Sequence, residues 1–268
     1  METNKLKDLK LVLEKIPGLV LGFSGGVDSS LLAVVAHEAL GNKMLAVTVA
    51  SVFCPAKEIA QAKEMARKFH FPHVVLEANP LSNDIVTGNP PDRCYHCKKM
   101  VFGKLLEIAK EKGFSYVADG SNLDDRSDYR PGMKAIAELQ VVSPLLQAGL
   151  TKADIRQLSK ELGLPTWSKE SAACLASRVP YGEALTKEKL ERVDQAEEFL
   201  SSYGFTHLRV RSHGQIARLE VGQEDFSKLL NSAGRKAIVM KLKELGFLYI
   251  TLDLEGYRMG SLNEVLHK

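Results

Sequence analysis

The sequence predicts an α/β protein in which a parallel sheet is covered by helices and a smaller α+β domain follows. Short apolar runs, typical of buried parallel strands, occupy residues 19–23, 44–49, 73–76 and 116–119. Helical patterns lie between them at residues 28–40, 55–70 and 98–112. This alternation indicates helices on both faces of the sheet. Because ligands of such sheets bind beyond the carboxyl ends of the strands, the chemistry is expected near residues 24, 51–54 and 120–122.

The last third of the chain has a different pattern. An apolar run at 141–146 is followed by a helix at 152–162, with Thr151 as its N-cap and a stop at Gly163-Leu164-Pro165. Beyond it the pattern predicts a helix at 186–203, strands at 207–211 and 215–221, a helix at 234–245 and a strand at 249–254. We therefore divide the chain into residues 1–181 and a small α+β domain of residues 182–268.

Composition narrows the class of protein. The 268 residues include 36 basic and 33 acidic side chains, a balance that argues against a dedicated grip on a polyanion. No apolar stretch approaches the length of a membrane span, and the first residues resemble an amphipathic helix rather than a signal peptide. We expect a cytoplasmic protein. Its four cysteines then point to metal binding or catalysis rather than to disulfides.

The most informative motif follows the first apolar run, where SGGVDSS spans residues 24–30. A strand, a glycine loop and a helix in this order direct backbone N–H groups toward one anion, most often phosphate. The motif lacks the lysine of a G-x-x-x-x-G-K-[ST] loop. It resembles the SGGxDS loop of the ATP pyrophosphatases, the PP-loop enzymes, which use ATP to adenylate a carbonyl or carboxyl oxygen and release pyrophosphate. The resemblance implies that the pyrophosphate part of ATP binds to Ser24, Gly25, Gly26, Asp28, Ser29 and Ser30.

Three of the four cysteines form the second motif. Cys94 and Cys97 make a C-x-x-C pair at the head of a helix, and Cys174 lies in a stretch of small residues. The pair is compatible with a zinc site, a redox dithiol, inert buried thiols or a [4Fe–4S] cluster that also uses Cys174. We favour the cluster, because three ligands leave one iron open for hydrosulfide or substrate sulfur. Cys54 follows an apolar strand and is expected to pack as a small hydrophobe.

With three further strings the chain resembles the LarE family throughout its length. The strings are CLASR at residues 174–178, LRVRSHG at 208–214 and GYRMGSLNE at 256–264. LarE proteins are ATP-dependent sulfur transferases of nickel-pincer nucleotide cofactor biosynthesis, which serves lactate racemase. The resemblance implies a PP-loop catalytic domain, a pyridinium bis-carboxylate mononucleotide as substrate, and adenylation of its carboxylate by ATP with Mg²⁺. Sulfur then displaces AMP and leaves a thiocarboxylate.

The resemblance also implies residue roles. Gly120 and Asn122 correspond to a second nucleotide-contact stretch, and Asp28 is the expected Mg²⁺ ligand. Arg178, Arg209 and Arg211 are expected to contact the substrate, since paired guanidinium groups suit a phosphate. In one mode of the family a lone cysteine at the Cys174 position gives up its own sulfur. The presence of the C-x-x-C pair instead favours the mode in which three cysteines hold a cluster.

Some questions stay open at this level. A PP-loop enzyme of tRNA thiolation is the main alternative, although no zinc ribbon accompanies the cysteines. We expect a homo-oligomer, in which the small domain contributes to assembly and to substrate phosphate contacts, and an external sulfide donor. Asp125 and Arg126 are expected in a solvated loop, Glu197 and Glu198 as surface charges of a helix. Glu197, Glu198 and Glu220 are alternatively candidate metal ligands, and the pattern does not decide whether Trp167 stacks on a substrate or packs.

Overall fold

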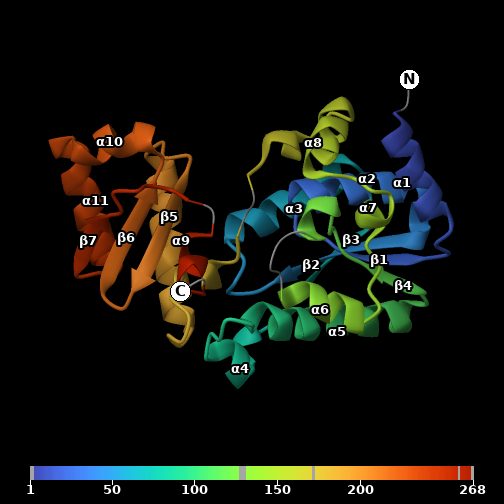
Figure 1. Ribbon diagram of the computed structural model, residues 1–268, viewed down its shortest axis with the longest axis horizontal. Coiled ribbons are helices and arrows are strands. Elements are labelled where there is room, and N and C mark those ends of the chain that lie inside the picture. The colour runs from blue at the N-terminus through green and yellow to red at the C-terminus, as the bar shows by residue number, and fades with distance from the viewer. Residues whose placement is uncertain (1–2, 127–130, 171–172, 259, 267–268) are drawn as a thin grey trace. The chain divides into compact units, whose positions relative to one another are not determined.

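The computed structural model describes residues 3–126, 131–170, 173–258 and 260–266 of the chain (Figure 1). Met259, part of the string at 256–264, lies outside them. The chain forms two compact units. The first comprises Met1–Pro80 and Asp92–Ala172, and the second comprises Leu81–Pro91 and Ala173–Lys268. The main change of unit therefore falls at 172/173 rather than at 181/182, and residues 81–91 belong with the second unit.

The first unit is built on a parallel sheet of strand order β3-β2-β1-β4. Its strands are β1 (Leu19–Gly22), β2 (Met44–Ala50), β3 (His73–Glu77) and β4 (Tyr116–Ala118). All four were predicted from apolar runs. The run at 141–146 adds only a parallel bridge from Val142 to Ala118, because Pro144 then begins a short helix.

Helices cover both faces of this sheet (Figure 1). They are α1 (Asn4–Glu14), α2 (Val27–Leu40), α3 (Ala56–Lys68), α5 (Arg93–Lys112), α6 (Pro131–Glu138), α7 (Pro144–Gln147) and α8 (Lys152–Glu161). Alternation along β1 divides the core: Leu19 and Leu21 pack with α1, α2, α3 and α8, whereas Val20 packs with α5 and α6. The expected α/β class is confirmed. No helix within the described ranges is long and apolar enough to cross a membrane.

The order of the strands places the candidate site. The chain runs outward from β1 through β2 to β3 and then returns to the other side of β1 as β4. The carboxyl ends of β1 and β4 therefore flank the point at which the winding direction changes, where open α/β sheets bind ligands. The glycine loop follows β1, and the Gly120–Asn122 stretch follows β4.

The second unit contains a three-stranded sheet of order β5-β6-β7. Its elements are β5 (Leu208–His213), β6 (Ile216–Val221), β7 (Tyr249–Leu252), α4 (Asp84–Thr87), α9 (Lys187–Ser202), α10 (Phe226–Leu230) and α11 (Ser232–Glu244). β5 and β6 form an antiparallel hairpin around Gly214, whose φ of 58° suits a tight turn. Buried residues of α9, among them Leu190 and Val193, cover the sheet.

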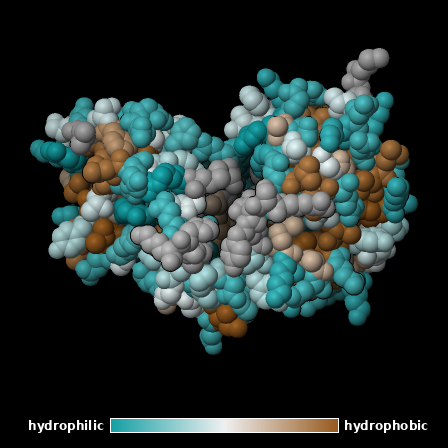
Figure 2. Space-filling view, in the orientation of Figure 1, coloured by the Kyte–Doolittle hydropathy of each residue, from teal (hydrophilic) through white to brown (hydrophobic). Residues whose placement is uncertain are grey.

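Apolar side chains also lie on the surface of the second unit. Those that are more than half exposed include Met240 of α11, Leu248 just before the edge strand β7, and Tyr249 at the start of β7. Figure 2 shows brown surface over these elements. This surface is consistent with the expected assembly role of the small domain, which remains a prediction.

Asn89 joins residues 81–91 to the rest of the second unit. It is fully buried, adopts a φ of 55°, and its side-chain amide donates to the carbonyl oxygens of Val179 (3.2 Å), Pro180 (2.7 Å) and Glu183 (3.2 Å). Its own carbonyl accepts from the N–H of Gly182 at 2.9 Å. An asparagine is suited here because it tolerates a positive φ and supplies two donors.

Replacing this amide should weaken the second unit. Asn89→Ala leaves buried carbonyl groups without donors and should lower the free energy of unfolding by about 2 kcal/mol. Urea unfolding measures the loss, and hydrogen exchange should locate it in residues 81–91 and 179–183. The control Asn263→Ala removes an exposed contact with Tyr181 and should change stability little. Equal stability of Asn89→Ala and the wild type would contradict this role.

Candidate active site

The glycine loop leaves the amino end of α2 open to a ligand. Gly26 is the N-cap and makes no side-chain capping bond, so the first N–H groups of the helix stay available. The hydroxyl groups of Ser24 and Ser29 lie 3.1 Å apart, and the Ser24 hydroxyl accepts from the N–H of Gly26 at 3.3 Å. Ser30 is buried, and its hydroxyl has no partner in the described part of the chain.

Two glycines let neighbouring segments approach this loop closely. Gly25 has a φ of 70°, and a Cβ there would lie 3.2 Å from the Cβ of Ala62 on α3. A Cβ on Gly120 would lie 3.2 Å from the backbone nitrogen of Ser29. The end of β4 thus packs directly against the first turn of α2.

Asp28 connects three segments at this point. Its Oδ1 accepts from Asn122 Nδ2 at 3.2 Å, and its Oδ2 accepts from Lys152 Nζ at 2.5 Å. The predicted residues Asp28, Gly120 and Asn122 are therefore neighbours in space. Lys152 was missed; the Thr151–Asp154 capping box, visible in the sequence, sets it at the first position of α8.

A second carboxylate lies beside this cluster. Asp119 is buried at the end of β4 and accepts from the hydroxyl groups of Ser121 (2.5 Å) and Ser143 (2.6 Å). Lys98 Nζ of α5 lies 3.7 Å from its Oδ2. These bonds fix the backbone that presents Gly120. Ser121 lies in the stretch predicted to contact the nucleotide, whereas Lys98, Asp119 and Ser143 were not predicted as site residues.

The expectation of a solvated loop is wrong for Asp125. This residue is buried, and its Oδ2 accepts from the N–H of Asn122 at 3.0 Å. Asp125 therefore holds the loop that carries Asn122. The side chain of Arg126 lies outside the described residues. Trp167 is exposed and packs under Lys160, whose Nζ lies 4.9 Å from the ring centroid.

Helix α5 begins at Arg93, five residues earlier than predicted, so Cys94 and Cys97 lie in its first two turns. At a spacing of three residues the two side chains share one face of the helix. Cys94 is exposed and Cys97 is half-buried, and both thiols are free of disulfides. Cys54 is half-buried rather than fully packed.

In the second unit, Cys174 precedes a 3-10 helix at Leu175–Arg178 and is held by its backbone. Its carbonyl oxygen accepts from the N–H of Ser177 (2.9 Å), the Ser177 hydroxyl (2.7 Å) and Arg178 Nη1 (3.3 Å). Arg178 is itself fixed by Glu197, with Nε–Oε1 and Nη2–Oε2 distances of 2.9 Å. Glu197 is therefore part of a buried ion pair, contrary to the expectation of a surface charge, whereas Glu198 is exposed.

The other two predicted arginines alternate along β5. Arg211 is buried and donates to Glu220 Oε2 (2.7 Å), the Ser261 hydroxyl (3.0 Å) and the Ser177 carbonyl (2.8 Å). The guanidinium of Arg209 lies 5.1 Å from the ring centroid of Tyr257. Burial, and secondarily the charge of Arg178, lowers the pKa of Arg209.

These internal bonds bear on substrate contact. Arg178 and Arg211 already use their guanidinium groups to fix the Cys174 turn and Glu220, so a substrate phosphate would share them with carboxylates. Contact of the three arginines with substrate stays a prediction.

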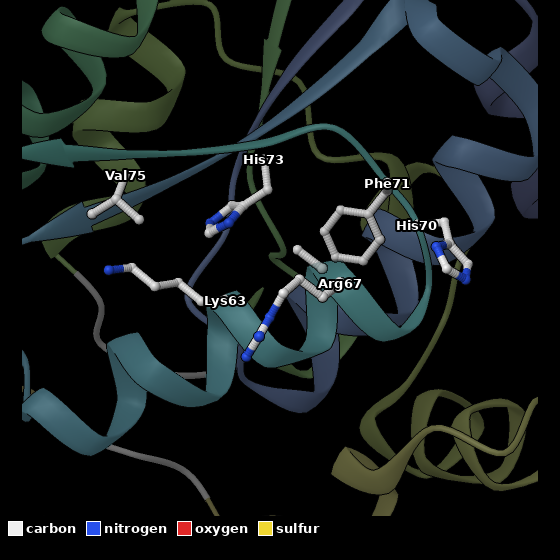
Figure 3. A pocket seen from close by; sticks show the side chains of 7 residues that line it. Lys63, Arg67, His70, Phe71, His73 and Val75 are labelled. Atoms are coloured by element: carbon white, nitrogen blue, oxygen red, sulfur yellow. The ribbon is translucent and has the colours of Figure 1, made fainter.

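A cavity of about 830 Å³ opens between α3 and the edge strand β3 (Figure 3). Lys63, Arg67 and His73 contribute to its lining. The Thr48 hydroxyl group donates its one hydrogen to the carbonyl oxygen of Phe23 at 2.8 Å. His73 Nε2 lies 2.8 Å from the Thr48 hydroxyl oxygen and must therefore donate to it. Burial, and then Lys63, lowers the pKa of His73.

The residues fit the expected inorganic groups to different extents. Asp28 offers a carboxylate that is 23% exposed, the kind of oxygen ligand that Mg²⁺ prefers, although Lys152 occupies one of its oxygens. Cys94 and Cys97 offer two soft donors one turn apart, which fits an iron–sulfur cluster in part. Among the described residues no group of three or more His, Cys, Asp or Glu side chains is arranged to hold a metal ion.

Comparison with known proteins places the chain among adenylating enzymes. The NAD synthase family pattern matches residues 4–89. A pyridinium-3,5-bisthiocarboxylic acid mononucleotide synthase of Lactiplantibacillus plantarum is 37% identical over 265 residues, which cover 98% of this chain and 95% of that protein. An uncharacterised protein of Synechocystis sp. is 40% identical over 268 residues, all of both chains. A tRNA-specific 2-thiouridylase of Brucella suis is 25% identical over 246 residues, which cover 76% of this chain and 60% of that protein.

The parallel sheet, the SGG loop after β1 and the family match together define a PP-loop enzyme of the ATP pyrophosphatase class. Similarity over nearly the whole chain to the Lactiplantibacillus plantarum synthase narrows the class further. The chain belongs to the LarE family and is an ATP-dependent sulfur transferase.

A side chain at Gly25 should damage the loop. Gly25→Ala forces a residue with a Cβ to a φ of 70° against Ala62 and should cost about 1–2 kcal/mol of stability. It should also weaken ATP binding at the loop, which calorimetric titration measures. Gly26→Ala is the matched control for stability, because Gly26 has a φ of −77° and a Cβ would meet only the Ser24 hydroxyl. A Gly25→Ala protein as stable as Gly26→Ala would contradict this geometry.

His73 should make stability depend on pH. Because its folded-state pKa lies below the usual 6.5, the unfolded chain binds the proton first, and stability decreases as the pH falls through 6.5. Urea unfolding at about pH 8 and about pH 5.5 should show this decrease in the wild type and a smaller one in His73→Gln. His70→Asn, which alters the same cavity, should keep the wild-type dependence. An unchanged slope in His73→Gln would refute the assignment.

Proposed function

We propose that this protein adenylates a carboxylate of pyridinium-3,5-biscarboxylic acid mononucleotide and replaces AMP by sulfur, in the biosynthesis of the nickel-pincer cofactor of lactate racemase. The observation that carries the proposal is the 37% identity to the Lactiplantibacillus plantarum synthase over 98% of this chain. The glycine loop is expected to bind ATP, and the CLASR string contains the cysteine expected in sulfur transfer. Both lie within the part of the chain that matches this synthase.

The first step takes place at the carboxyl ends of β1 and β4. The open N–H groups of α2 bind the pyrophosphate part of ATP, and Asp28 would hold a Mg²⁺ ion that neutralises its charge. A substrate carboxylate oxygen attacks the α-phosphorus, the bond to the β-phosphate oxygen breaks, and pyrophosphate leaves. The product is an acyl adenylate, in which AMP is a good leaving group.

In the second step a sulfur nucleophile attacks the acyl carbon and AMP leaves with the bonding electrons. The product is a thiocarboxylate. Sulfur that arrives as hydrosulfide keeps its oxidation state in this step, so the step needs no oxidant or reductant. A [4Fe–4S] cluster on Cys94, Cys97 and Cys174 would supply bound hydrosulfide at neutral pH. Cys94 and Cys97 are the third and sixth residues after Pro91, and Cys174 is the second after Ala172. All three thus lie close in sequence to points where the chain passes from one unit to the other.

The second unit prepares Cys174 and the substrate. Arg178, itself paired with Glu197, donates to the carbonyl oxygen of Cys174, so the backbone that carries the thiol is fixed within that unit. Arg209 and Arg211 line one face of β5, where the nucleotide phosphate of the substrate is proposed to bind. We further propose that the enzyme works in the cytoplasm as a homo-oligomer, supplied by a sulfide donor.

A thiolation assay tests this function. Purified protein incubated without oxygen with Mg–ATP, sulfide and the pyridinium bis-carboxylate mononucleotide should release AMP and pyrophosphate and form a thiolated product. A preparation that carries the cluster should be brown, and Cys94→Ala should lose both the colour and most of the product, by about tenfold or more. Cys54→Ala is the matched control and should keep both.

Two results would contradict these statements. Thiolation of tRNA without product from the mononucleotide would replace the proposed substrate. A Cys94→Ala protein that completes one turnover and becomes lighter by the mass of one hydrogen sulfide would show sacrifice of Cys174, and the cluster would be discarded.

A further inference from the structure

The most completely bonded ammonium group near the glycine loop belongs to Lys169, a residue without a role in the chemistry described above. Its Nζ donates to Glu58 Oε2 at 2.6 Å, to Gln61 Oε1 at 2.7 Å and to the carbonyl of Gly25 at 3.1 Å. An ammonium group has three N–H donors, so all of them are used. Lys169 therefore has no spare donor for a phosphate.

The surroundings of this contact are rigid. Glu58 and Gln61 lie in the first two turns of α3, next to Ala62, against which Gly25 packs. The side chains of Lys169 and Glu58 are only 18% and 15% exposed, so water screens their ion pair weakly. The contact therefore ties residue 169 to the loop itself.

The backbone around Lys169 is held independently. Arg156 of α8 donates from Nη1 to the carbonyl of Trp167 at 2.7 Å and from Nη2 to the carbonyl of Lys169 at 2.9 Å. The N–H of Lys169 donates to the carbonyl of Thr166 at 3.0 Å. Main chain and side chain of residue 169 are thus both fixed within the first unit.

Chain length turns this anchor into a limit on Cys174. Cys174 is the fifth residue after Lys169, and a fully extended chain of that length spans at most about 18 Å between the two Cα atoms. This limit follows from covalent connectivity alone. If residue 169 were released, the residues before it would also be free to extend, and the Cys174 thiol would move over a longer distance.

We propose that Lys169 is a positioning residue, which anchors the segment bearing Cys174 to the glycine loop so that sulfur transfer follows adenylation. The proposal rests on the function proposed above. It assigns no contact between Lys169 and substrate or ATP. Its consequence is selective: loss of the anchor impairs the transfer of sulfur more than the formation of the adenylate.

The test compares the two half-reactions in Lys169→Met, Lys169→Arg and the double variant Lys169→Met/Glu58→Gln, which leaves no unpaired carboxylate. Adenylation, measured by pyrophosphate exchange, should change by less than about threefold, whereas single-turnover thiolation should fall by about tenfold or more. Lys169→Arg, which keeps the charge, should restore part of the thiolation. Lys10→Met removes an ion pair with Glu38 and should leave both half-reactions unchanged.

Hydrogen exchange separates this proposal from the proposed function. The amides of residues 165–170 should exchange at least about tenfold faster in both variants that carry Lys169→Met, whatever the substrate proves to be. If the wild type makes no thiolated product but exchange rises as stated, the function is wrong and the anchor stands. Unchanged exchange, or a parallel loss of adenylation and thiolation, would overturn the anchor.

Discussion

The contact between the glycine loop and the end of β4 is the constraint on which the rest of the first unit depends. Gly120 packs against the backbone of Ser29, and Asn122 bonds Asp28, so two segments more than ninety residues apart form one surface. The strand order makes this contact possible, because β4 pairs with β1 on the side opposite to β2 and β3. The amino end of α2 then faces a ligand at the point where the sheet changes direction. A slip of either strand would separate the donors from the carboxylate.

Three lysines join elements around this surface. Lys98 links α5 to Asp119, Lys152 links α8 to Asp28, and Lys169 links the segment before Cys174 to α3 and the loop. Each is partly shielded from water and bonds to a carboxylate that is itself fixed. Ion pairs therefore hold the loops of the site, whereas apolar packing holds the strands.

The second unit is also held by ion pairs, which are formed there by arginine and glutamate. Arg178 with Glu197 and Arg211 with Glu220 are largely buried pairs, and both arginines also donate to a backbone carbonyl and to a hydroxyl group. Removing one partner from such a pair leaves a charge without compensation, which is far more costly than loss of a surface ion pair. The turn that carries Cys174 is thus held within its own unit. A sulfur nucleophile needs both a fixed direction and a short reach.

The sequence by itself determined the α/β class, the four parallel strands, the glycine loop and the family, because apolar periodicity and short motifs are local properties. The capped start of α8 at Thr151 was equally legible. Tertiary structure alone decided that Asp125 is buried, that Glu197 pairs with Arg178, that α5 starts early enough to include Cys94, and that Lys152 and Lys169 hold the loop. It also decided that residues 81–91 fold with the second unit through Asn89. Such partners are distant in the chain, and the cost of burying a charge or an amide is set by what lies across from it.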